Sequence, residues 1–305
     1  MIKRTVEISS QAAHVTVRNQ QLLVQREGQT VGSIPCEDLG VLLVDHPGTT
    51  YSHAALMSLA ESEAVLVICG RDHLPSAILL PLSDHTQIVW RIGEQLSAAK
   101  PLHKRLWKQL VQAKVRAQAA NLAVDCPAYS KLLALATQVR SGDPDNIEAQ
   151  AARIYWTNWR PEESFRRDAD AGELNSLLNY GYAVLRAAVA RAIVAAGLMP
   201  AIGLHHANRS NSFCLADDLM EPLRPMVDQR AREMYVQGYR ELTSEAKGRL
   251  LELLAEQVEL NGQIGPLMVN LHRFVGSLVR CFQGQAKRLE IPQPCLSADT
   301  DVCGS

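Results

Sequence analysis

The sequence has 305 residues, of which 47% are hydrophobic, and its formal net charge at pH 7 is −1. This length and apolar content indicate two domains with substantial cores, and the balanced charge excludes a strongly basic nucleic-acid binder of the kind that composition alone reveals. Charge is nevertheless divided along the chain, because residues 1–85 carry a net charge of −4 and the remaining residues carry +3.

The seven cysteines form no Cys-x-x-Cys pair. This spacing argues against a structural zinc site and against a dense disulfide framework, and it favours a reducing cytoplasm. The N-terminus, MIKRTVEISS, is not followed by a long apolar stretch. No secretory signal is therefore expected.

Residues 1–85 predict a small, mainly β domain with one helix. Alternation and β-branched residues indicate strands, and the helix is expected over Tyr51 to Glu61. The predicted strands are Thr5 to Ile8, His14 to Arg18, Gln21 to Gln25, Thr30 to Ile34, Leu39 to Val44 and Ala64 to Cys69.

Beyond residue 85 the apolar pattern takes a period of 3.6, which predicts a larger, all-α domain over 86–290 and an α+β fold overall. Helices are expected over 86–97, 101–123, 128–140, 145–156, 173–198, 214–241, 243–259 and 264–288. Ala183 to Leu198 is very apolar, but Arg186 and Arg191 interrupt it and it is short for a membrane span, so a core helix is expected. Residues 159–171 are expected to form a loop, and 291–305 a disordered tail.

A dense polar constellation contains His205 and His206, followed by Asp217, Asp218 and Glu221. If 214–228 is helical, Asp218 and Glu221 share a face, whereas Asp217 is rotated by roughly 100° from Asp218. Paired carboxylates with an imidazole could hold Mg²⁺ or Mn²⁺. The alternative is that they are acids favoured by a helix dipole. Adjacent histidines point to different faces, so at most one would reach the same site.

Glu148 lies in a second polar island, on a predicted helix with small neighbours. Those neighbours allow close helix packing, so this glutamate could be buried. The alternative is the ordinary one for a lone helical glutamate, a solvated surface residue.

Three islands of basic residues follow the first domain and could contact a phosphate backbone, although solvated helix faces are commonly basic as well. The candidate DNA contacts in them are Lys104, Arg105 and Lys108, then Arg166 and Arg167, then Arg273 and Arg280.

Taken together, these segments resemble the CRISPR-associated integrase family, also called Cas-one, and in particular its type II branch. The resemblance covers nearly the whole chain apart from the tail. Its motifs are Ile34 to Asp45, Ala113 to Gln118, Ile147 to Trp156, Leu178 to Tyr182 and Gly203 to Pro225. Ala149 departs from the glycine that most members carry after the metal-binding glutamate.

The resemblance implies that Glu148, His206 and Glu221 are catalytic and bind one divalent ion, Mg²⁺ or Mn²⁺, with Asp218 nearby as an auxiliary acid. The resemblance also implies which of the two histidines binds the metal. The family's metal-binding histidine precedes the two acids by twelve and fifteen residues, and counting back from Asp218 and Glu221 gives His206.

The implied activity is insertion of new spacers into a CRISPR array, in which the 3′-hydroxyl of a DNA fragment attacks a repeat phosphodiester by transesterification. Water in place of the hydroxyl would give nuclease activity. The implied partners are double-stranded DNA fragments, CRISPR repeat DNA, a second copy in a homodimer, and a small CRISPR-associated adaptation protein that bridges two dimers. No membrane is expected.

Two other functions remain open from the residues. A stand-alone, structure-selective nuclease for branched DNA would need the same metal site but no repeat. A non-catalytic DNA-binding scaffold would use the acidic cluster only to hold helices together, and metal-dependent strand transfer would separate it from the integrase.

Overall fold

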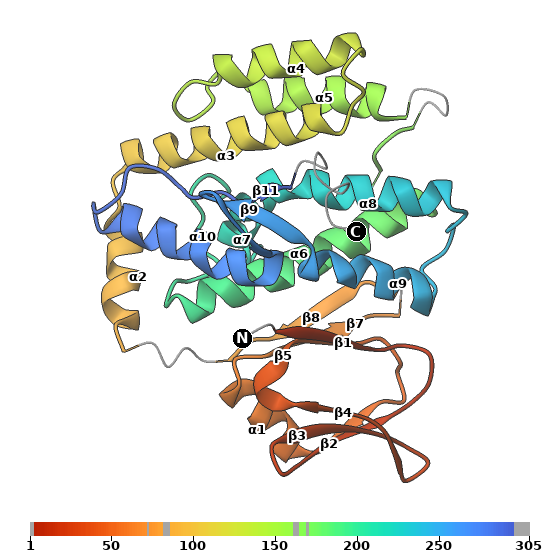
Figure 1. Cartoon of the computed structure of the whole chain (residues 1–305). Coiled ribbons are helices and arrows are strands. Elements are labelled where there is room, and N and C mark those ends of the chain that lie inside the picture. Colours follow the sequence, from red (N-terminus) through yellow and green to blue (C-terminus); the bar gives the residue numbers. More distant parts are fainter. Residues whose placement is uncertain (1–2, 72, 82–85, 161–164, 169–170, 296–305) are drawn as a thin grey trace, which may run out of the picture.

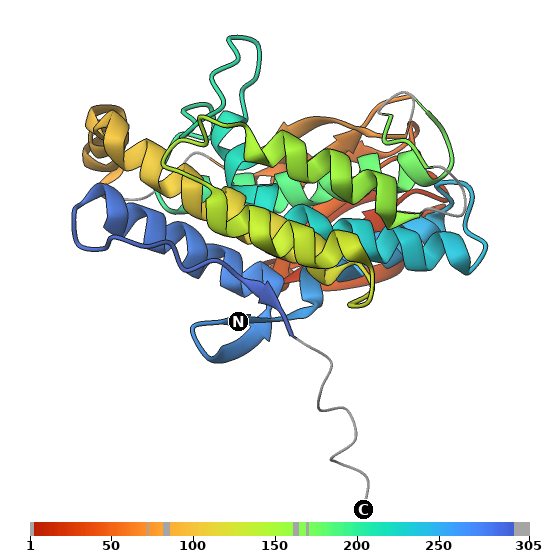
Figure 2. The ribbon, with the colours of Figure 1, turned by 90° about the horizontal axis from the view of Figure 1, so that it is seen from above.

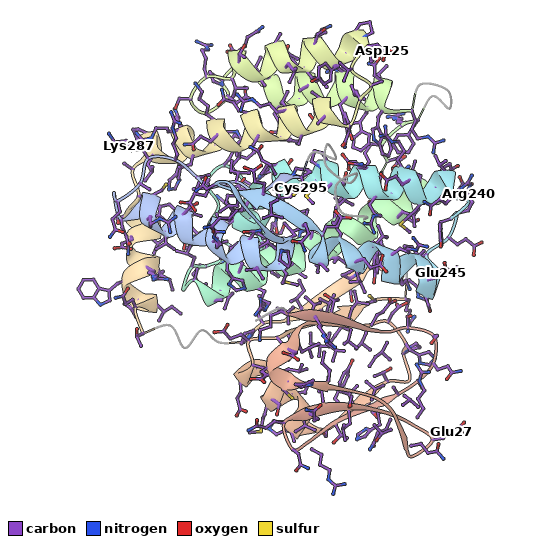
Figure 3. The ribbon with its side chains drawn as sticks, in the orientation of Figure 1. Glu27, Asp125, Arg240, Glu245, Lys287 and Cys295 are labelled. Carbon is purple, nitrogen blue, oxygen red and sulfur yellow. The ribbon has the colours of Figure 1, made fainter. Side chains whose placement is uncertain are left out.

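The computed structural model describes residues 3–71, 73–81, 86–160, 165–168 and 171–295. A strand-rich N-terminal unit packs beneath a larger helical unit (Figure 1). Glu27 lies at the outer end of the β3–β4 hairpin, and Asp125 lies far from it, between α3 and α4 (Figure 3). The predicted α+β class is confirmed.

The N-terminal unit contains two four-stranded sheets that enclose a core with α1 (His53–Glu61). Helix α1 begins at Ser52, whose hydroxyl accepts a hydrogen bond from the Ala55 N–H. The first sheet has the order β1 (Arg4–Ile8), β5 (Leu39–Val44), β7 (Val65–Cys69) and β8 (Pro75–Leu79). The second has the order β4 (Gln29–Pro35), β3 (Gln21–Arg26), β2 (His14–Arg18) and β6 (Thr50–Tyr51).

The central position of strand β5 in its sheet explains why the sequence of this strand is continuously apolar instead of alternating. It pairs in parallel with β1 on one side and β7 on the other, and every residue of it is buried. A strand covered on both faces has no solvent side on which polar residues would be favoured. The six predicted strands of this unit are present, whereas β6 and β8 were not predicted.

The helical unit is built around α3, which contacts α4 and α5 on one side and α7, η3 and α8 on the other (Figure 1). Figure 2 looks down on the α3, α4 and α5 layer. The described helices of the helical unit are α2 (Ile88–Ser97), α3 (Lys100–Ala120), α4 (Pro127–Gln138), α5 (Ile147–Trp159), α6 (Leu174–Ala195), α7 (Cys214–Met220), α8 (Arg224–Val236), α9 (Ser244–Leu251) and α10 (Leu267–Phe282), with 3₁₀ turns η3 (Glu221–Leu223) and η4 (Glu252–Ala255).

The expectation of an all-α second domain is wrong at one place, where a three-stranded sheet has the order β10 (Gln263–Pro266), β9 (Gln257–Leu260), β11 (Gln293–Pro294). Helices had been expected through both β9 and β10. The turn between them is Asn261-Gly262, with φ of 53° and 74°. Asn-Gly with two positive φ angles is the strongest short hairpin signal, and it ends the helical pattern here.

Two further boundaries differ from the prediction. The helix expected over 214–241 is divided into α7, η3 and α8, because Pro222 and Pro225 cannot donate backbone hydrogen bonds within one continuous helix. The tail expected from Ile291 is not free at its start, since β11 pairs with β9. Residues 296–305 lie outside the described residues.

Helix α6 is the one helix in the described chain that is long and apolar enough to cross a membrane, but 78% of its apolar window is buried inside the protein. Arg191, within that helix, is 2% exposed and donates to the Glu63 carbonyl of the N-terminal unit. Helix α6 is therefore a core helix, as predicted.

Candidate active site

Glu148, His206 and Glu221 come from three separate elements, the start of α5, the segment between α6 and α7, and the start of η3. A shared neighbour brings the two glutamates together. The Lys114 ammonium, on α3, lies 2.6 Å from Glu148 Oε1 and also pairs with Glu221 Oε2. The pKa of His206 is raised first by its hydrogen bond to Asp218 and further by the charges of Glu221 and Glu148. The structure thus places Glu148 and Glu221 on one shared lysine, with His206 in the electrostatic field of both carboxylates.

Glu148 is fixed by the way α5 begins. Asn146 takes a left-handed conformation with φ of 51°, and the Asp143 carboxylate then accepts hydrogen bonds from the N–H groups of Ile147 and Glu148, both at 2.9 Å. These N–H groups have no partner within the helix, so an acidic side chain that accepts from them stabilises its first turn. Glu148 is therefore held in that turn, with its side chain 24% exposed.

Asp218 organises the segment that carries the two histidines. Its fully buried carboxylate accepts from the N–H groups of Leu204 (2.6 Å), His205 (2.9 Å) and His206 (3.2 Å), and it bonds His206 Nδ1 at 2.6 Å. This last bond raises the pKa of His206 and outweighs the partial burial of the ring, which lowers it. It also leaves Nε2 as the ring nitrogen that can bind a metal.

The rings of His205 and His206 lie in different environments, as expected for neighbours in sequence. His205 stacks on the buried Trp107 with the ring centroids 4.2 Å apart and an interplanar angle of 1°. His206 meets Trp107 edge-on at 5.7 Å. The geometry favours His206 as the ligand, because His205 is the one that packs flat on the tryptophan.

Asp217 is turned away from Asp218, as helical rotation predicts. Its carboxylate pairs with Arg186 at 2.7 Å and accepts from the Asn211 amide at 2.6 Å. Asp217 therefore belongs to a different cluster from the one that Glu221 forms.

Glu221 stays ionised although it is only 5% exposed. Burial alone would raise its pKa, but the Lys114 ammonium and the Arg224 guanidinium outweigh burial and lower it. Arg224 Nε lies 2.9 Å from Glu221 Oε1, so each carboxylate oxygen faces a cation. Arg224 is held in turn by the Tyr182 ring, 4.8 Å from its central carbon.

Lys114 is the important residue whose role the sequence analysis did not identify, although it lies in the Ala113 to Gln118 motif. A signal was present in its spacing. Trp107, Leu110, Val111 and Lys114 recur at helical intervals on α3, and all four are buried. A lysine in register with an apolar stripe predicts a buried acidic partner, because an unpaired buried ammonium is very unfavourable.

The donor types at this position suit a divalent cation. Two carboxylates and one imidazole are donors that Mg²⁺ or Mn²⁺ accepts, and the Lys114 ammonium already acts as a positive group between the two carboxylates. In the described part of the chain, no three His, Cys, Asp or Glu side chains lie together closely enough to hold a metal. The position that a cation would need between Glu148 and Glu221 is taken by the lysine.

The predicted DNA contacts lie in different surroundings. Lys104, Arg105 and Arg166 are exposed, and Lys108, Arg167, Arg273 and Arg280 are partly buried. Three of them already have protein partners, among them Arg273, which donates to the Asn270 side chain at 3.4 Å. Arg167 donates to the side chains of Asn175 and Asn179, and Arg280 pairs with Glu290 at 2.6 Å. The exposed residues are the better candidates for contacting a ligand, and a DNA role stays a prediction for all seven.

Comparisons with known proteins agree on one family. The family model described as "CRISPR associated protein Cas1" matches residues 6–245. The CRISPR-associated endonuclease Cas1 of Neisseria meningitidis serogroup C (strain 8013) is 36% identical over 284 residues, which cover 92% of each chain. A CRISPR-associated endonuclease Cas1 of Pyrobaculum aerophilum is 29% identical over 294 residues, 90% of this chain and 98% of that protein.

Solved structures give the same fold at lower sequence identity. A casposase bound to integration product has a TM-score of 0.77 at 18% identity and covers 95% of this chain and 93% of its own. A Cas1 protein from Thermotoga maritima has a TM-score of 0.75 at 17% identity, with coverages of 92% and 98%.

Proposed function

The chain belongs to the Cas1 family of CRISPR-associated proteins, and from this we propose that it is a metal-dependent DNA endonuclease and integrase that inserts new spacers into a CRISPR array. One observation carries the proposal. Glu148 and Glu221 share a cation in a largely buried site, beside a histidine that Asp218 orients. The names of the relatives, endonucleases of this family, support the same chemistry.

Glu148, Glu221 and His206 Nε2 would hold Mg²⁺ or Mn²⁺. When bound, such an ion lowers the pKa of an attacking hydroxyl and neutralises charge at the phosphoryl group. Asp218 keeps the His206 ring in place, and Arg224 holds the Glu221 carboxylate ionised against burial. The attacking 3′-hydroxyl of a DNA fragment displaces a 3′-hydroxyl of the repeat strand, and water in its place would cleave the strand.

The partners we propose are a second copy of this chain in a homodimer, the DNA fragment, the repeat, and a small CRISPR-associated adaptation protein between two dimers. A fold relative in a complex titled "Cas6-RT-Cas1--Cas2", with a TM-score of 0.75 at 19% identity, supports the last of these. That match covers 93% of this chain but 35% of the other. We place the protein in the cytoplasm, where such DNA would be met.

Strand transfer tests the proposal. A short duplex with free 3′-hydroxyls, a repeat-containing plasmid, the small partner and Mg²⁺ or Mn²⁺ would be incubated with wild type, His206→Ala and His205→Ala. We expect joining by wild type and by His205→Ala, and a loss of at least about 100-fold in His206→Ala, because a metal ligand is removed. DNA binding without joining by wild type would favour a scaffold. Cleavage of branched DNA without joining would favour a stand-alone nuclease.

A further inference from the structure

Lys114 is an unusual residue to find in contact with both glutamates. It lies in the middle of α3, is 8% exposed, and projects from the same face as Trp107 and Leu110. Its ammonium forms an ion pair with Glu148 Oε1 at 2.6 Å and a second ion pair with Glu221 Oε2. A long side chain is thus immobilised to place one positive charge between two carboxylates.

Each oxygen of the Glu221 carboxylate already faces a cation. Oε1 faces Arg224 at 2.9 Å and Oε2 faces Lys114, while Lys114 also lies 2.6 Å from Glu148 Oε1. A divalent ion bound to these oxygens would lie within a few ångströms of the ammonium, and two like charges at that distance repel strongly in a buried site. Lysine and metal therefore compete for the same carboxylates.

We propose that Lys114 is a resident counter-ion of the metal centre, which holds Glu148 and Glu221 together before metal arrives and which the incoming divalent ion displaces. The inference rests on the proposed function in one respect, that both glutamates are metal ligands. Lys114 is a positioning residue in this account, since it acts through the two carboxylates.

A buried hydrogen-bond acceptor near Lys114 could receive the displaced ammonium. Gln118 lies four residues after Lys114 on α3, so the two side chains are neighbours on one helical face. Gln118 is 3% exposed, and its Oε1 is buried without a hydrogen-bond partner among the described residues. Such an acceptor carries a cost in free energy that an N–H donor would relieve. A rotation of the lysine side chain along the helix would satisfy it.

Mn²⁺ binding by titration calorimetry and thermal melting in chelator test the proposal, with wild type, Lys114→Met and Lys131→Met. Lys131, exposed on α4, controls for loss of one positive charge. In chelator, Lys114→Met should melt below wild type, because two carboxylates lose their counter-ion. Its Mn²⁺ dissociation constant should fall by about tenfold or more, since the lysine-bound form is the majority state and no longer competes. Lys131→Met should match wild type in both.

A second variant, Gln118→Leu, separates displacement from simple repulsion between charges. It keeps Lys114 but removes the acceptor, so Mn²⁺ should bind more weakly than to wild type while the melting temperature in chelator is unchanged or higher. Repulsion alone would leave the Mn²⁺ affinity of this variant at the wild-type value, and that result would overturn displacement toward Gln118.

Equal or weaker Mn²⁺ binding by Lys114→Met would overturn the proposal as a whole. A failure of the proposed function would look different, because wild type would then bind no Mn²⁺, or Glu221→Gln would bind it as tightly as wild type does.

Discussion

Four hydrogen bonds converge on Asp218, three from backbone N–H groups and one from His206 Nδ1. Asp218→Asn keeps the shape of the side chain but turns an NH₂ group toward donors. We expect the unfolding free energy to fall by about 2–4 kcal/mol, because hydrogen bonds to a buried charged group are lost. Metal-dependent DNA cleavage should fall by about 10–100-fold as His206 loses its orientation. Urea denaturation and a cleavage assay measure both, and wild-type values in either would remove this role for Asp218.

Asp228 is a second buried carboxyl, behind the site. It accepts hydrogen bonds from the hydroxyls of Tyr155, at 3.0 Å, and Tyr182, and burial raises its pKa from 3.8 to about 6. Between pH 4 and 6 the folded state therefore keeps the Asp228 proton, whereas the unfolded state releases it. Protonated Asp228 thus stabilises the folded state fully below about pH 4, and this contribution to the unfolding free energy is lost as the pH rises through about 6.

The pH dependence of Asp228→Asn tests this assignment. Relative to the variant, wild type should lose up to about 3 kcal/mol of unfolding free energy between pH 4 and 7, which corresponds to a shift of about two pKa units. Chemical denaturation of both proteins across this range gives the difference. Parallel curves for the two proteins would show that Asp228 has an ordinary pKa.

At the residue scale, type and spacing indicated a possible metal site at Asp218, Glu221 and one of the two histidines, whereas Glu148 and the choice of His206 came from the resemblance to the family. The stacking of His205 on Trp107, which favours the same choice, depends on α3 lying beside a segment about 100 residues away in sequence. The Lys114 contacts depend on α3, α5 and η3 meeting, which no local pattern specifies. They could be anticipated only from a lysine on an apolar helical stripe.

Helix α9 is joined to the residue that follows strand β5 by a buried ion pair between Lys247 and Asp45, each with a side chain 3% exposed. His73 Nδ1 lies 3.0 Å from the same Asp45 carboxylate. A second contact between the two units lies close by in the sequence, where the Ser9 hydroxyl donates to the hydroxyl of Ser244. The pair thus joins an element of the helical unit to the N-terminal unit with two charges removed from water.

Lys247→Met should lower the unfolding free energy by about 3–5 kcal/mol, because it leaves the Asp45 carboxylate buried without its cation. The double variant Asp45→Leu/Lys247→Met should recover most of that loss, since no buried charge remains. Urea denaturation of the two variants and wild type checks both statements. A Lys247→Met protein within about 1 kcal/mol of wild type would mean that water reaches the carboxylate.

At the element scale, strands with clear alternation and helices with long apolar stripes were predictable because local periodicity reports which face is buried. The β9–β10 hairpin was missed because its four-residue strands are too short to show a period of two against a helical background. Its Asn261-Gly262 turn was the only local signal that could have found it. Strand β11 could not have been found at all, since two residues owe their pairing to β9.

The whole molecule places its proposed chemistry at the centre of the helical unit. Helix α3 contacts α5 and η3, which carry Glu148 and Glu221, and the N-terminal unit packs on the opposite side of that unit from α4 (Figure 1). The division into a strand-rich and a helical part was predictable from the change of period near residue 85. Their packing was not, because it depends on buried contacts such as Lys247 with Asp45, whose partners are 202 residues apart.

A crystal soaked with Mn²⁺ and measured at the manganese absorption edge tests the central claim most directly. We predict one anomalous peak bound by Glu148, Glu221 and His206 Nε2 at about 2.0–2.3 Å, with Lys114 moved away from both carboxylates. A cleavage-competent protein with no manganese at these three side chains, and with Lys114 still between the glutamates, would contradict it.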